Sequence, residues 1–87
     1  MGFLYILYSQ RLNLYYVGST SDPSRRISEH QRGQTPSTAQ GCPWGVELVQ
    51  SFPSIHQAKS AEQKLKLWKS RRIIEFIIRD GKMSSVG

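Results

Sequence analysis

The sequence has a single cysteine, Cys42, and no long run of apolar residues. One thiol cannot form an intramolecular disulfide or a cysteine-based zinc site. A protein with a single cysteine is compatible with a reducing compartment. No apolar stretch approaches the roughly 20 residues that a membrane span needs, and the first residues lack the basic start and the small-residue cleavage site of a signal peptide. These absences predict a cytoplasmic protein without a membrane segment.

Acidic residues are also few. Twelve Lys and Arg stand against six Asp and Glu, which leaves a net charge of +6 on only 87 residues. Such an excess produces a positive potential that attracts phosphate groups, so nucleic acid is the leading partner. A basic protein that binds no polyanion is the alternative. A chain of this length supports one hydrophobic core and therefore one domain.

The first part of the chain predicts a β-hairpin. Residues 3–8 and 14–17 are aromatic and branched, and a polar segment separates them, which is the pattern of two antiparallel strands, the first covered on both faces. Because side chains alternate along a strand, Tyr5 and Tyr16 share a face if the register allows it. Gly18 ends the second run without a side chain and leaves space above the sheet for a backbone or a ligand.

A helix is predicted directly after the hairpin. Asp22 is a suitable N-cap, Pro23 suits the first helical position and Gly33 is a usual C-terminal stop. Arg26 and His30 are four residues apart and therefore share one face of this helix. A turn of backbone N–H groups and an arginine pair then lie at one end of the sheet, which is a usual way to hold a phosphate.

A loop and a third strand follow. Residues 34–43 contain little that can be buried, so we expect a mobile surface loop. Residues 44–52 have the alternation of a strand, with Val46 and Leu48 on one side and Glu47 on the other.

The last part of the chain predicts two helices. Apolar residues recur at helical spacing from Ile55 to Trp68. Ser70 is a suitable N-cap for a second helix from Arg71 to Arg79, which has a broad apolar face and ends at Asp80-Gly81. The order strand, strand, helix, strand, helix, helix indicates an α+β domain, a three-stranded antiparallel sheet flanked by helices. We expect residues 1–82 to form this domain and residues 83–87 to be a disordered tail.

Glu62 has an unusual position in the first of these two helices. At 100° per residue it lies inside the apolar arc, between Ile55 and Ala58. A carboxylate on the buried side of a helix costs free energy unless a positive group meets it. A structural salt bridge to one of the twelve basic side chains and a functional role are both open at this point.

Together these features resemble the GIY-YIG endonuclease family over residues 3–79. Five positions in the right order and spacing make the resemblance specific: Tyr5 in Phe3-Leu4-Tyr5, Tyr16 in Tyr16-Val17-Gly18, Arg26 ten residues later, His30 one turn further on, and Glu62 in an Ala-x-x-x-Glu-x-x-Leu-Lys helix. The sequence departs from the family in two ways. Phe3 and Leu4 replace the glycine and isoleucine of the first triplet, and Asn13, the only asparagine, lies in the hairpin turn and not after the last helix.

The resemblance implies a metal-dependent DNA endonuclease that hydrolyses phosphodiester bonds, with selectivity for branched DNA as one expectation and DNA repair or recombination as its setting. It implies Glu62 as the ligand of a single divalent cation, Mg²⁺ or Mn²⁺, and Arg26 as the partner of the scissile phosphate. Tyr16 would orient or deprotonate the attacking water, with Tyr5 in support. His30 would assist proton transfer or contact a phosphate.

Each assignment has a plain alternative. Tyr5 and Tyr16 are also ordinary sheet aromatics, and His30 is also an ordinary helix-surface residue. Two functions stay open, a nuclease and a nucleic-acid-binding module that needs a protein partner for catalysis, with a basic scaffold protein ranked third. The side chains expected to contact nucleic acid are Arg25, Arg26, Arg32, Lys66 and Lys69.

Overall fold

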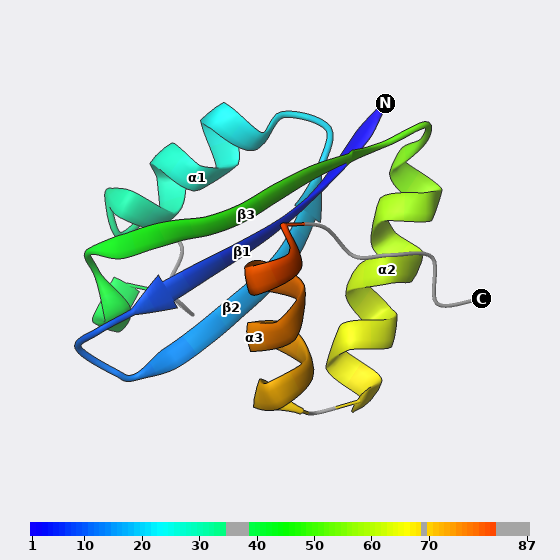
Figure 1. The fold of residues 1–87 in the computed structure, drawn as a ribbon. Helices are drawn as coiled ribbons and strands as arrows, with labels where there is room; N and C mark the ends of the chain where they lie inside the picture. The colour runs from blue at the N-terminus through cyan, green and yellow to red at the C-terminus, as the bar shows by residue number, and fades with distance from the viewer. Residues whose placement is uncertain (35–38, 69, 82–87) are drawn as a thin grey trace.

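The computed structural model describes residues 1–34, 39–68 and 70–81, which form a three-stranded antiparallel sheet and three α-helices in the expected order (Figure 1). The α+β architecture is therefore confirmed. None of the described helices is long and apolar enough to cross a membrane. Lys69 and the predicted tail, residues 83–87, lie outside the described residues. The elements are β1 (Gly2–Ser9), β2 (Leu14–Thr20), α1 (Pro23–Gln31), a 3-10 helix η1 (Ala39–Gly41), β3 (Trp44–Phe52), α2 (Ile55–Trp68) and α3 (Arg71–Asp80).

The first strand is the centre of the sheet, whose strand order is β2-β1-β3. Residues 4–7 are at most 1 % exposed, so β1 is covered on both faces as predicted. In the hairpin register Tyr5 lies opposite Gly18 and Leu7 lies opposite Tyr16. Tyr5 and Leu7 are two residues apart on β1 and so share a face, and Tyr16 is paired with Leu7. Tyr5 and Tyr16 therefore project from the same face of the sheet.

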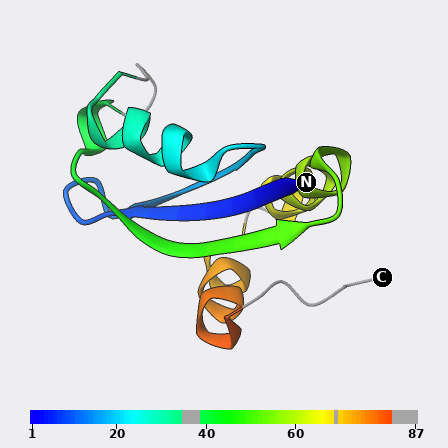
Figure 2. The same cartoon turned by 90° about the horizontal axis from the view of Figure 1, so that it is seen from above.

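The helices lie on different sides of this sheet. Figure 2 shows α1 above the sheet, α3 below it and α2 beside the end where β1 begins. The alternation of β1 separates two apolar clusters. The larger, which we call the lower core, contains Leu4, Ile6, Val17, Leu48, Ala61, Leu65 and Ile77. The smaller, which we call the upper cluster, contains Tyr5, Leu7 and Trp44, with Tyr16, Ile27 and Cys42 packed against it.

The predicted helix ends are confirmed. Asp22 Oδ1 accepts a hydrogen bond from Arg25 N at 3.2 Å, and Ser70 Oγ accepts one from Ile73 N at 3.3 Å. Gly81 follows α3 in the left-handed conformation (φ 85°), which a glycine adopts without steric cost.

The expected apolar face of α3 is narrower than its composition indicates. Ile77 is buried and Ile73, Ile74 and Ile78 pack against the lower core, but Phe76 is 63 % exposed. Phe76 is one residue before Ile77, so it lies about 100° round the helix and faces outward.

The third strand does not alternate as predicted. Val46 is half exposed whereas Leu48 is buried in the lower core, although the two were expected on one side. The register of β3 against β1 shifts between Ile6 and Leu7, so that Leu48 lies opposite Ile6 and Val46 lies opposite Leu7. A β-bulge inserts one extra residue, here Glu47, and this moves Val46 and Leu48 to opposite faces.

Residues 39–43 are not the exposed loop that the composition predicted. Gly41 is buried, and its carbonyl accepts a 2.7 Å hydrogen bond from Ser9 Oγ. A Cβ atom at Gly41 would lie 2.4 Å from the Trp44 ring, so a residue with a side chain would clash with the ring at this position. The prediction failed because this segment is held against the sheet by a hydrogen bond, which its lack of apolar residues did not indicate. Residues 35–38, the rest of the predicted loop, are outside the described residues.

Candidate active site

Tyr5 lies at the centre of the upper cluster. Its side chain is 1 % exposed and its hydroxyl is 3.1 Å from His30 Nε2. The ring covers Gly18, where a Cβ atom would lie 2.4 Å from Tyr5 Oη. The space that we expected above Gly18 for a ligand is therefore filled by Tyr5. Burial, with the nearby Tyr16, raises the pKa of Tyr5 to about 12, so its hydroxyl stays protonated at neutral pH.

Tyr16 and His30 complete an aromatic group around Tyr5. The ring centroids of Tyr16 and His30 are 4.8 Å apart, and those of Tyr5 and Tyr16 are 6.2 Å apart. Tyr16 is only half buried, whereas His30 is fully buried and does not reach the surface. Direct contact of His30 with a phosphate, one of its expected roles, is therefore wrong for this structure. Burial and the charge of Arg26 lower the pKa of His30, so the ring is neutral at pH 7.

Arg26 comes from the first turn of α1 and is held by two groups. Its Nη1 donates to Glu29 Oε1 at 3.0 Å, and it also interacts with the Tyr5 hydroxyl. Both contacts raise the pKa of Arg26, which fixes its positive charge. Arg25 Nε also donates to Glu29, to Oε2 at 3.3 Å, but the Arg25 side chain is 78 % exposed. The two neighbouring arginines thus differ, since only Arg26 is directed at the buried tyrosine.

These arginines border a hollow of about 270 Å³ beside the turn from β2 to α1. A cation and backbone N–H groups at the start of a helix favour an anion at such a place. Its lining residues are Thr20, Ser21, Asp22, Arg25, Arg26 and Glu29.

Glu62 projects from α2 to the end of β2. Ser19 Oγ donates to Glu62 Oε1 at 2.5 Å, and Lys66 Nζ donates to Glu62 Oε2 at 2.5 Å. The salt bridge left open by the sequence therefore exists, with Lys66. The charge of Glu62 raises the pKa of Tyr5 while Arg26 lowers it, so both charges act on one hydroxyl. Glu62 and Arg26 therefore both lie within electrostatic reach of the Tyr5 hydroxyl.

This site has the donor chemistry of a weakly held, hydrated cation. Within the described part of the chain no three His, Cys, Asp or Glu side chains form a group that could enclose a metal ion. Mg²⁺ usually keeps several waters and is bound through one or two carboxylates together with substrate phosphates. Glu62, whose side chain is 19 % exposed, fits the role of a lone carboxylate ligand.

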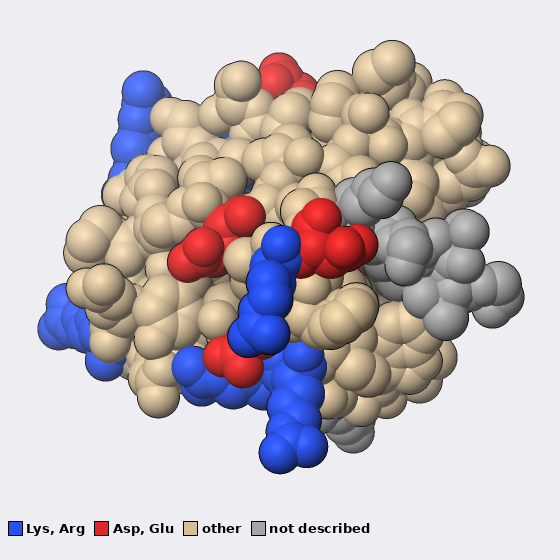
Figure 3. All heavy atoms as spheres, viewed as in Figure 1, with Lys and Arg blue, Asp and Glu red and all other residues tan. Residues whose placement is uncertain are grey.

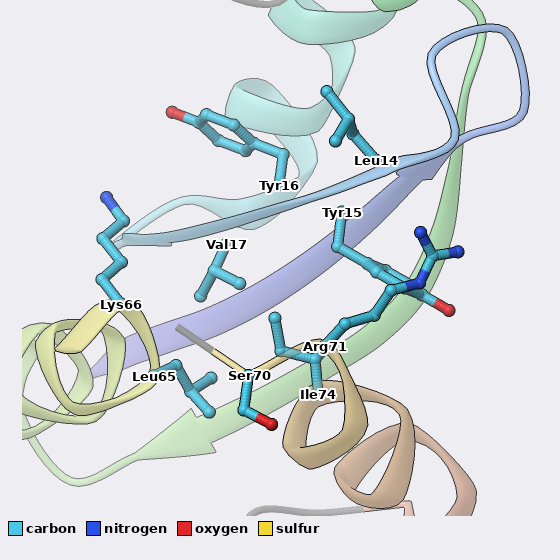
Figure 4. A pocket seen from close by; sticks show the side chains of 9 residues that line it. All are labelled: Leu14, Tyr15, Tyr16, Val17, Leu65, Lys66, Ser70, Arg71 and Ile74. Carbon is cyan, nitrogen blue, oxygen red and sulfur yellow. The ribbon is translucent and has the colours of Figure 1, made fainter. Parts of the chain in front are cut away.

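A groove of about 340 Å³ follows the free edge of β2 next to this site (Figure 4). Lys66 and Tyr16 line one part of it, and Tyr15 and Arg71 line another. The Arg71 guanidinium lies 5.1 Å from the centre of the Tyr15 ring. The remaining lining residues are Leu14, Val17, Leu65, Ser70 and Ile74.

The expected nucleic-acid contacts are only partly brought together. Arg25, Arg26 and Lys66 border the site or the groove, whereas Arg32 is exposed at the other end of α1 and Lys69 is outside the described residues. Figure 3 shows acidic side chains among the Lys and Arg side chains on the face that carries β3 and α3, so the residues coloured there form no continuous basic surface.

Ser19 was not identified from the sequence. Strand alternation places it on the opposite face from Tyr16, toward α2, and this was the only signal available. Nothing in the local pattern indicates that its partner is Glu62, because the two residues meet only after α2 has packed against β2.

Residues 1–74 match the family model of the GIY-YIG catalytic domain. By fold and match, the protein is a small α+β catalytic domain of the nuclease type. It belongs to the GIY-YIG family, which implies a nuclease-type phosphodiesterase with a nucleic-acid substrate, and whose domains typically use a divalent metal.

A solved structure supports this classification. The chain is similar to the solution NMR structure of a UPF0213 protein from Bacillus halodurans, with 31 % sequence identity and a TM-score of 0.57 over 91 % of this chain and 84 % of that chain. No curated protein gives a significant match.

Proposed function

We propose that this protein is a divalent-metal-dependent endonuclease that hydrolyses phosphodiester bonds in DNA. The observation that carries the proposal is the buried Tyr5 hydroxyl, which interacts with Arg26 and is near enough to Glu62 for the charge of that carboxylate to raise its pKa. Three separate elements, β1, α1 and α2, supply these groups. Binding alone does not require a carboxylate at this place, since a carboxylate repels phosphate.

Arg26 has the features of a phosphate ligand. Glu29 and Tyr5 hold its side chain beside the hollow at the start of α1. A fixed planar guanidinium binds two phosphate oxygens and offsets the charge that develops on them in the transition state, which is better suited to Arg than to Lys.

The two tyrosines would have different roles. Tyr5 keeps its proton near neutral pH, since its pKa is about 12, so it would accept a hydrogen bond from Arg26 and could donate one of its own, but it would not act as a base. Tyr16 is the more exposed of the pair and would orient or deprotonate the attacking water. His30 lies behind both rings and would hold Tyr5 in place through their 3.1 Å contact. A divalent cation bound at Glu62 would supply Lewis-acid stabilisation of the leaving oxygen.

One observation favours a second function, a nucleic-acid-binding module that needs a partner for catalysis. Both oxygens of Glu62 have protein partners, Ser19 and Lys66, so a cation must compete for this carboxylate. We propose DNA repair or recombination as the setting of either activity.

Cleavage assays separate the two functions. The purified protein with Mg²⁺ or Mn²⁺ is tested on plasmid and on flap, fork, four-way and linear DNA. We expect nicking or cutting, and we expect Arg26→Ala and Glu62→Ala each to lower the rate by about 10³-fold, since each removes charge stabilisation of the transition state. Arg25→Ala is the matched control for Arg26→Ala and should keep most of the activity.

DNA binding is measured in parallel. Binding should survive Glu62→Ala, because that change removes a negative charge, and should weaken as salt rises, because counterion release drives it. Wild-type rates in Glu62→Ala would contradict the assignment of the metal ligand. Tight binding without cleavage of every substrate with every metal would favour the binding module.

A further inference from the structure

The Glu62 carboxylate has two partners of different kinds. Ser19 donates a neutral hydroxyl to Oε1, and Lys66 donates a charged ammonium to Oε2, both at 2.5 Å. Ser19 is half buried on β2, where it lies opposite Leu4 in the paired hairpin. The Lys66 side chain is 56 % exposed and one helical turn from Glu62 on α2.

This difference determines which partner a cation can replace. The Ser19 backbone is fixed by the sheet, and its hydroxyl carries no charge that would oppose a metal ion. The Lys66 ammonium does carry such a charge. Lys66 is the exposed partner of this pair, and an i, i+4 ion pair on a helix contributes only about 0.3–0.5 kcal/mol, so little free energy holds Lys66 in place. Its long side chain can also move while the helix stays as it is.

We propose that Ser19 is a positioning residue that keeps Glu62 directed at the site, whereas Lys66 is a placeholder that a divalent cation displaces from Oε2, freeing its ammonium for a DNA phosphate. The proposal rests on the proposed function, because it takes Glu62 as the metal ligand.

The freed lysine has a suitable destination. Lys66 lines the groove along the free edge of β2 together with Tyr16, and Arg71 lines the same groove (Figure 4). A DNA strand that passes Tyr16 into this groove would therefore meet one more unpaired cation when the metal is bound. Metal and DNA then increase each other's affinity, and by thermodynamic linkage the factor is the same in both directions.

Mn²⁺ binding without DNA tests both partners by a signal that needs no cleavage. Titration followed by electron paramagnetic resonance should give about 10- to 100-fold weaker binding for Ser19→Ala, as found for other residues that hold a metal ligand in place. Ser19→Thr should restore binding, and Ser60→Ala, an exposed serine on α2, should leave it unchanged. Lys66→Met should bind Mn²⁺ about twofold more tightly than Lys64→Met, which removes the same charge from an exposed position of α2.

The salt dependence of DNA binding tests the release of Lys66. With Ca²⁺, which should fill the site without supporting cleavage, the slope of log affinity against log salt should steepen in the wild type by about 0.9, one phosphate contact. Lys64→Met should keep this change in slope, and Lys66→Met should lose it.

The outcomes are distinguishable. Equal Mn²⁺ affinity for Lys66→Met and Lys64→Met, or an unchanged slope with Ca²⁺ in the wild type, would overturn the role of Lys66. Unchanged Mn²⁺ affinity in Ser19→Ala would overturn that of Ser19. If Glu62→Ala still weakens Mn²⁺ binding in those cases, the metal assignment survives and only this inference fails. If Glu62→Ala binds Mn²⁺ as the wild type does, the proposed metal site fails first.

Discussion

The two faces of the sheet are built from the same central strand but differ in chemistry. Below β1, the lower core is made of aliphatic side chains such as Leu4 and Ile6, which are fully buried. Above it, the upper cluster is aromatic and partly polar, with the Tyr5 hydroxyl against the His30 ring. Successive side chains of β1 therefore pack alternately into an apolar core and into a site with titratable groups.

This difference indicates how so small a domain combines stability with a polar site. Each fully buried Leu or Ile contributes about 1.5–3 kcal/mol of transfer free energy, so the lower core is the main source of stability. In the upper cluster the polar atoms are matched with one another. Across residues 1–34, 39–68 and 70–81 no buried side-chain nitrogen or oxygen lacks a hydrogen-bond partner. Ser19 and Glu62 show that the site also draws on α2, which packs with the lower core.

Truncation of adjacent buried residues is the strongest test of this comparison. Ile6 and Leu7 are each fully buried, on opposite faces of β1. Ile6→Ala and Leu7→Ala should each lower the free energy of unfolding by about 2–5 kcal/mol, because each leaves a cavity. Urea unfolding measures this loss.

Cleavage rates then separate the two faces. At a temperature where both variants are folded, Leu7→Ala should also lower kcat, because Leu7 packs with Tyr5 and Trp44, whereas Ile6→Ala should not. An equal loss of kcat in both variants would mean that the faces are not functionally separate.

A methyl group at Gly18 should disturb the upper cluster selectively. In Gly18→Ala the new Cβ would lie 2.4 Å from Tyr5 Oη, so the ring must move. We expect a loss of about 1–3 kcal/mol in unfolding free energy, the usual cost of overpacking, with a clear fall in cleavage rate. Ala at Gly45, where the nearest atom to the added Cβ is 3.8 Å away, is the control. Wild-type activity of Gly18→Ala would show that the Tyr5 position is not critical.

The pH dependence of stability should show the smallest effect, and two groups on the upper side of the sheet contribute to it, Tyr5 and its neighbour His30. The pKa of His30 is lowered from 6.5 by burial, so neutral His30 stabilises the fold above pH 6.5 and this contribution is lost as the pH falls below that value. The pKa of Tyr5 is raised from 10.0 to about 12, so its contribution is present below pH 10 and is lost as the pH rises toward 12.

Melting temperatures of variants isolate the contributions of His30 and Tyr5. Between pH 7.5 and 5.5 the melting temperature of the wild type should fall more than that of His30→Gln. Between pH 9.5 and 11.5 it should fall more than that of Tyr5→Phe. Circular dichroism follows both transitions. Parallel curves for the wild type and either variant would mean that the group in question does not titrate differently on folding.

Much of this molecule could be predicted from local patterns. The caps Asp22 and Ser70 are found where their residue types predicted them, because capping depends on a few neighbouring residues. The shared face of Tyr5 and Tyr16 follows from strand alternation and the hairpin register. The order and spacing of Tyr5, Tyr16, Arg26, His30 and Glu62 were sufficient to indicate the family, although not to indicate which residues these side chains contact.

Local sequence patterns were thus sufficient for the order of the elements, the caps of α1 and α3, the doubly covered central strand and the family. The burial of His30, the bulge at Glu47 that separates Val46 from Leu48 and the contact of Ser19 with Glu62 became visible only in the folded chain. Local periodicity states which way a side chain points within its own element. It does not state which residue of another element meets that side chain, because that depends on how β2, α1 and α2 pack once the chain has folded.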